Sequence, residues 1–83
     1  SLNAYPNDNV IINHNVTSAS ITATGTSNVI INATGILAIT GNLKVNESGT
    51  GSGRLTNNGV LTVSNELKIG GGSNSGNISS NQL

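Results

Sequence analysis

A repeated five-residue segment constrains the fold of this chain more than any other feature. Residues 9–13 read Asn-Val-Ile-Ile-Asn, and the same five residues recur at 28–32, an offset of 19. Repetition at a fixed short period is typical of repeat proteins, in which each unit buries its apolar side against the next unit. The chain is therefore expected to consist of stacked repeats.

A second repeat occupies the other half of the chain. From Gly35 to Gly70 the sequence divides into six units of equal length, GILAIT, GNLKVN, ESGTGS, GRLTNN, GVLTVS and NELKIG. Five of the six carry Leu at the third place, and the alternation of apolar with polar residues is that of a β-strand with one inward side. A leading Gly suits the corner between two strands. Three units would make one coil, which places GILAIT over GRLTNN and GNLKVN over GVLTVS at a spacing of 18.

The two repeats together predict an all-β chain, folded as a right-handed parallel β-solenoid with about four coils of 18–19 residues. The hand follows the general preference for right-handed crossovers. We expect one solenoid segment over residues 1–83, part of a longer repeat protein or filament, with loop-like interruptions at 47–53 and 70–76, which lack aliphatic residues. A β-sandwich is the alternative fold, but its strands do not normally repeat at one period.

The alternation also predicts which side chains face the interior. The expected core stripe consists of Val10, Ile12, Val29, Ile31, Leu37, Ile39, Leu43, Val45, Leu55, Leu61, Val63, Leu67 and Ile69. Asn13, Asn32 and Asn46 each follow a strand in this pattern. Because stacked copies of a side-chain amide can hydrogen-bond one another, we expect these three asparagines to form a structural ladder.

Composition excludes several classes of function. The chain has no Cys, which removes disulfides, thiolate nucleophiles and sulfur-ligated metal sites. Three basic and three acidic residues give a net charge of zero, so the sequence offers no basic surface for nucleic acid. The longest runs of Val, Ile and Leu, such as Val10–Ile12, are far shorter than a membrane span. We expect no nucleic-acid partner and no membrane span.

The few chemically active residues do not predict a site. His14 is the only histidine and is expected in a surface turn. Glu66 follows Glu47 at an offset of 19, so the two could stack on one face, but a glycosidase or lyase needs clustered carboxylates or a basic group beside a cation. Gly70–Gly72 lacks the Asp of calcium-binding glycine-rich repeats. We therefore expect no catalytic residue, no metal, no cofactor and no enzymatic activity.

Two binding functions stay open as alternatives. Thr22, Thr24 and Thr26 form a short row of the kind that ice-binding solenoids repeat in every coil. The next coils are expected to place Leu43 and Val45 there, so the row would not recur. Carbohydrate contact is the other alternative, through Asn- and Thr-rich faces, although Tyr5 is the only aromatic side chain that could stack on a sugar.

The segment Tyr5–Thr17, which reads YPNDNVIINHNVT, and the later segments Gly41–Val45 and Leu55–Val63 resemble the Asn- and Thr-rich β-helical repeats of secreted surface proteins of the Bacteroidota. Adhesins of the filamentous-haemagglutinin kind have a similar period. The resemblance implies export by the type IX pathway, an extracellular or cell-surface location, and a role as a stalk or adhesive module without catalytic residues.

The expected function is accordingly a structural or adhesive spacer of an extracellular protein. A self-assembling filament subunit, stacking through uncapped ends, is the alternative. The expected partners are further coils of the same chain or neighbouring copies, with a glycan or a host-surface molecule as a further ligand.

Overall fold

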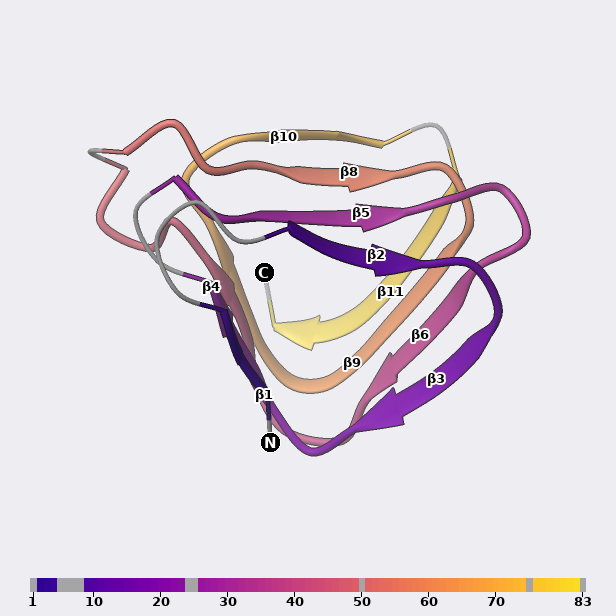
Figure 1. The fold of residues 1–83 in the computed structure, drawn as a ribbon. Coiled ribbons are helices and arrows are strands. Elements are labelled where there is room, and N and C mark those ends of the chain that lie inside the picture. Colours follow the sequence, from indigo (N-terminus) through magenta and orange to yellow (C-terminus); the bar gives the residue numbers. More distant parts are fainter. Residues whose placement is uncertain (1, 5–8, 24–25, 50, 75, 83) are drawn as a thin grey trace.

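The computed structural model describes residues 2–4, 9–23, 26–49, 51–74 and 76–82, and the regular elements in these ranges are all β-strands. The strands wind around one axis in coils of three, which form the triangular cross-section seen in Figure 1. The molecule measures 27 × 22 × 21 Å, and four coils about 4.8 Å apart would rise about 20 Å along their axis.

Successive coils contribute equivalent strands to the three faces. The first coil holds β1 (Leu2–Ala4), β2 (Asn9–Ile12) and β3 (Asn15–Ser18), and the second holds β4 (Ile21–Ala23), β5 (Asn28–Ile31) and β6 (Ile36–Ile39). The third coil holds β7 (Leu43–Val45), β8 (Leu55–Asn57) and the first half of β9 (Val60–Ile69). The fourth holds the second half of β9, β10 (Gly72–Asn74) and β11 (Asn77–Gln82).

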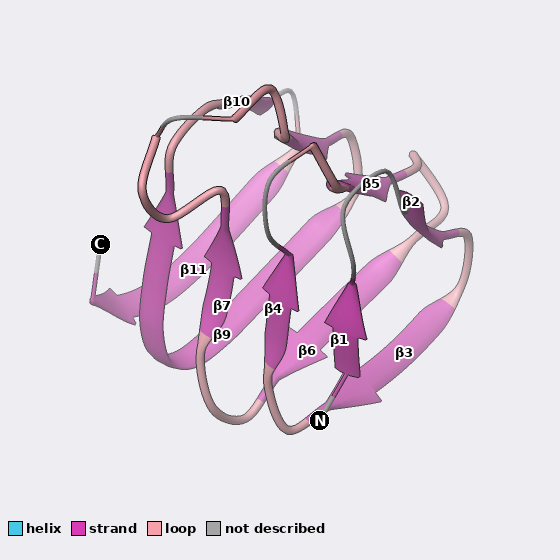
Figure 2. Ribbon diagram, turned by 60° about the vertical axis from the view of Figure 1, so that its left-hand side comes forward, coloured by secondary structure: helices cyan, strands magenta, loops and turns pink. Residues whose placement is uncertain are grey.

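Every pairing between these strands is parallel, which confirms the predicted β-solenoid of about four coils. The strands form a seven-stranded and a four-stranded sheet, and the long strand β9 bends around a corner so that it pairs with both β6 and β7. In Figure 1 the chain turns clockwise from β1 through β2 to β3 while it moves away from the viewer, and Figure 2 shows the same coils side by side. This sense of winding is right-handed.

The coils differ in length, and the fixed spacing predicted for the second half is wrong. In the first half Asn9 pairs with Asn28, the offset expected from the repeated segment. In the second half Ile36 pairs with Val60, so GILAIT lies over GVLTVS rather than over GRLTNN. GNLKVN likewise lies over NELKIG, with Leu43 against Leu67. The unit ESGTGS accounts for the difference, because its described residues, 47–49 and 51–52, lie in a loop between β7 and β8 instead of forming a strand.

The two predicted interruptions have different outcomes. Residues 47–49 and 51–53 lie in the connection between β7 and β8, as expected. The interruption predicted at 70–76 is wrong at its centre, because Gly72–Asn74 forms β10 and pairs with β8. Aliphatic side chains are not needed there, since a parallel ladder is made by backbone groups that the neighbouring strand presents whatever its side chains.

The interior is a single stack of aliphatic side chains. The predicted stripe is buried at eleven positions, Ile12, Val29, Ile31, Leu37, Ile39, Leu43, Val45, Leu55, Leu61, Val63 and Leu67. Val10 is half-buried and packs against this core. Ile69 departs from the prediction, with 42% of its surface exposed. Ile21 and Ala23 are buried although the sequence interpretation left them out.

Candidate functional site

Side-chain amides stack along the coil axis at three places. Asn32 donates through Nδ2 to Oδ1 of Asn13, as predicted. Asn28 donates in the same way to Asn9 at 2.9 Å, and Asn65 donates to Asn42 at 2.6 Å. In all three pairs the later coil donates to the earlier coil. The ladders therefore tie neighbouring coils together at their corners, beyond the backbone pairing of the strands.

Asn46 does not belong to this ladder, which corrects the prediction. Its backbone is left-handed, with φ of 49°, and its buried side chain holds the loop that follows. The Nδ2 group donates to the carbonyl of Gly51 at 2.8 Å, and the Gly51 N–H donates to Oδ1 at 3.1 Å. Asn tolerates the left-handed conformation better than most residues, so a strand-ending Asn here closes a loop instead of stacking.

Asn57 is a buried polar residue that the sequence interpretation missed. It continues the inward column of Ile31 and has no solvent exposure. The Gly59 N–H donates to its Oδ1 at 3.2 Å, and its Nδ2 donates to the carbonyl of Asn77 at 3.1 Å. Because both ends of the amide are hydrogen-bonded, the cost of burying it is offset. The alternation of β8, Leu-Thr-Asn, was the signal that could have placed it inward.

A column of glycines forms the corner between the second and third faces. The Val60 N–H donates to the carbonyl of Gly35 at 3.1 Å, and the Asn77 N–H donates to that of Gly59 at 2.9 Å. A Cβ at Gly59 would collide with the carbonyl oxygens of Gly35 and Asn32. The first coil has His14 at this corner, where it is exposed and its carbonyl accepts from the Ile36 N–H. His14 is thus a surface turn residue, as expected.

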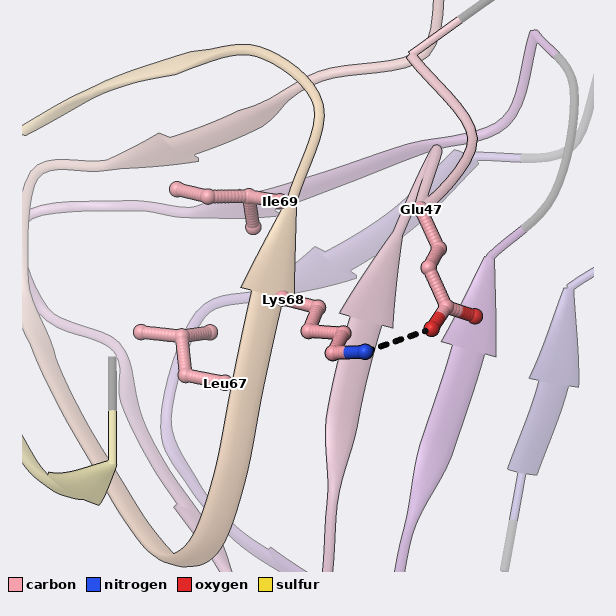
Figure 3. A pocket seen from close by; sticks show the side chains of 4 residues that line it. All are labelled: Glu47, Leu67, Lys68 and Ile69. Carbon is pink, nitrogen blue, oxygen red and sulfur yellow. Dashed lines mark ion pairs between the residues drawn. The ribbon is translucent and has the colours of Figure 1, made fainter.

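The most distinctive surface is the edge of the fourth coil at the second half of β9. Figure 3 shows Leu67 and Ile69 on one side of this strand and Lys68 on the other, toward Glu47. Glu47 Oε2 lies 3.4 Å from Lys68 Nζ and 3.9 Å from Lys44 Nζ. An open hollow of about 580 Å³ lies at this edge, lined by Glu47, Leu67, Lys68 and Ile69. The hollow thus combines an exposed aliphatic side chain with the ion pair of Glu47 and Lys68, and together with Lys44 this group carries one net positive charge.

The predicted chemical residues do not assemble elsewhere. Glu47 and Glu66 do not share a column, because the loop after Glu47 lengthens the coil between them; the Glu66 N–H instead donates to Oδ1 of Asn42 at 3.2 Å. In the described ranges no three His, Asp or Glu side chains group as a metal site would require. Tyr5 and Asp8 lie outside the described residues.

The threonine row does not recur in the following coils, as expected. The residues that take its place differ from the expected ones, because the register of the strands is different. Thr22 is followed by Lys44 and then Lys68 on the outer face, not by Leu43. Thr24 lies outside the described residues, so the row itself is not part of the described surface.

None of the described segments is a helix with the length and hydropathy that a membrane span needs. Comparison with protein-family models, with curated proteins and with solved structures gives no significant match. The parallel sheets and asparagine ladders are those of a β-solenoid repeat, and the function therefore has to be argued from the stack and its edges.

Proposed function

We propose that this chain is a rigid structural spacer, a segment of β-solenoid that holds two parts of an extracellular surface protein at a fixed distance along the solenoid axis. The observation that carries the proposal is the unbroken parallel pairing on all three faces, from β1 to β9, from β2 to β10 and from β3 to β11. Bending such a rod would stretch ladder hydrogen bonds on one face and compress the interior on another. Continuous ladders on three faces therefore favour stiffness.

The interior supports the same proposal. Most inward positions of equivalent strands are aliphatic in successive coils, as in the column of Val16, Leu37, Leu61 and Ile78, and the polar exception, Asn57, is hydrogen-bonded at both ends of its amide. Each coil thus presents to the next one a similar surface, which is what a spacer of variable length requires. The resemblance of the repeat to those of secreted surface proteins supports the extracellular location.

The test is a tandem fusion of two and three copies, with Leu83 joined directly to Ser1 of the next copy. This junction leaves four residues between the positions of Ser80 and Leu2, against three between Val63 and Leu67 in the third corner. Small-angle scattering is expected to show a maximum dimension that grows by about 20 Å per copy at constant cross-section, since four coils rise about 4.8 Å each.

The matched control joins the same copies through a flexible linker of about 20 Gly and Ser residues, whose mean span is about 25 Å. The control is expected to scatter as separate bodies with variable spacing. If the direct fusion scatters in the same way as the linker control, the spacer proposal is wrong.

A further inference from the structure

We propose that the C-terminal edge of the stack binds the N-terminal edge of a second copy of this chain, so that copies associate head to tail. The C-terminal edge consists of residues 67–69 of β9 together with β10 and β11, and the N-terminal edge consists of β1, β2 and β3. The inference rests on the proposed function, because both require coils to stack through these edges, and it names the partner and the polarity.

The backbone of the C-terminal edge supplies the first argument. Among the described strands, β10 pairs only with β8, β11 only with β9, and residues 67–69 of β9 only with β7. The outer side of each strand therefore carries peptide groups that point along the axis without a neighbouring strand. Exposed edges of this kind are templates for another strand in the same orientation.

Residue sizes along the register positions indicate which strand of a second copy fits the C-terminal edge. One register position of the first face is occupied by Ala4, Ala23, Val45 and Ile69, so residue size rises from Ala to Ile toward the C-terminal edge. A second copy in the same register would place an alanine, its Ala4, at the position after Ile69, the largest residue of the four. Alternation of large and small residues is how packed layers interlock. The exposed Ile69 and the hollow beside it would then lie against β1 of the copy.

The third face matches as well. Its column begins with Val16 and ends with Ile78, both half-buried and packed against the core, while Leu37 and Leu61 between them are fully buried. Head-to-tail stacking would put Ile78 of one copy against Val16 of the next and bury both. On the second face Gly72 would meet Val10, so the residue without a side chain would face a branched one.

Charge favours this polarity over the contact of two like edges. At one register position of the first face the residues are Asn3, Thr22, Lys44 and Lys68, so a following copy would place a neutral residue, Asn3, at the position after Lys68. Two C-terminal edges brought together would instead pair their strands antiparallel and bring together two groups of Lys44, Glu47 and Lys68, each with one net positive charge. A head-to-tail contact is heterologous and does not close, so it produces open rods rather than dimers.

The experiment measures the mass and shape of the 83-residue chain by light scattering and negative-stain microscopy, from micromolar to millimolar concentration. Mass is expected to rise continuously into rods of constant width. Ile69→Lys places a charge in the contact and is expected to weaken association at least tenfold. The matched control is Ile36→Lys, since Ile36 is 39% exposed on the outer side of β6, which is paired with β3 on one side and β9 on the other and so lies on neither edge; it is expected to assemble as the unmodified chain does.

A mixing experiment tests whether the copies associate head to tail, through rod length. Ile69→Lys keeps the N-terminal edge intact, so one part of it in ten parts of unmodified chain is expected to join rod ends and shorten the rods. If Ile69→Lys fails to fold by circular dichroism, Ile78→Lys replaces it, with Ile36→Lys again as the control. A mass that stops at the dimer, a folded chain that stays monomeric, or equal assembly of the Ile69 and Ile36 variants would each overturn the inference.

The two proposals fail separately. Straight tandem fusions whose free single copies never associate would leave the spacer function standing and remove the head-to-tail contact. Flexible tandem fusions together with monomeric single copies would remove both.

Discussion

Asparagine has three different roles in this chain, although the side chain is the same each time. Asn32 stacks on Asn13 at a corner, Asn46 takes a left-handed backbone and holds a loop, and Asn57 lies in the interior with both ends of its amide hydrogen-bonded. What separates them is the register and the backbone conformation of each position. A residue type that both donates and accepts can serve wherever a backbone group needs a partner.

Glycine at the third corner is required by the close approach of successive coils. Replacing Gly59 by Ala is expected to destabilise the fold by about 2–3 kcal/mol, because the new Cβ would meet backbone carbonyls that cannot move without disturbing two coils. Urea unfolding followed by circular dichroism measures the change.

Gly71→Ala is the control, because its Cβ would meet only the flexible side chain of Arg54, with Nη1 at 3.0 Å. Its unfolding free energy is expected to stay within about 1 kcal/mol of the original. Equal effects of the two substitutions would mean that the corner tolerates a Cβ and that the glycine column is not a packing requirement.

At the scale of elements, the connection between β7 and β8 explains how coils of unequal length keep one register. Asn46 and Gly51 close the base of this loop through two hydrogen bonds, and the strands on either side resume their columns as Val45 and Leu55. The extra residues of the third coil therefore leave the coil outward and do not shift the strands that follow.

Insertions are expected to be tolerated in this loop and not at a tight corner. Gly-Ser-Gly placed between Gly51 and Ser52, both exposed, is expected to change the unfolding free energy by less than about 1 kcal/mol, since lengthening a loop costs little closure entropy. The same insertion between Asn58 and Gly59 would separate β8 from β9 where backbone atoms are in contact, and should cost several times more. Comparable urea midpoints for the two insertions would contradict this account of the loop.

At the scale of the whole molecule, the fold is a one-dimensional stack in which each coil contacts only its neighbours. The second coil has paired strands on both sides, whereas β10 and β11 have a described neighbour on one side only. Interactions in such a stack add along the axis, so stability should fall toward the ends.

Hydrogen exchange should resolve this gradient. In dilute solution, where copies do not meet, amides of β5 and β6 are expected to exchange at least about tenfold more slowly than those of β10 and β11. Nuclear magnetic resonance gives the rates strand by strand. Uniform protection in all four coils would show that the chain unfolds as one cooperative unit and that the edges are no weaker than the middle.

The amino-acid sequence by itself determined the fold class and most of the interior. The identical segments at 9–13 and 28–32 pair in register, and the alternation of Leu with polar residues places the core stripe correctly from Ile12 to Leu67. Both signals can be read from the order of residues alone, because the repeat is an identity between two segments and the inward alternation depends only on neighbouring residues.

Only the tertiary structure decided how the coils align and which residues form the edge. The longer step from Ile36 to Val60 depends on whether ESGTGS enters the coil or leaves it, and that is decided by the closed loop at Asn46 and by the backbone ladders that adjacent coils offer. Ile69 follows the same alternation as the buried Leu67 and lies on the same segment of β9, yet 42% of its surface is exposed. The burial of a residue depends on which side chains of other segments pack against it. The periodicity within one strand does not contain this information.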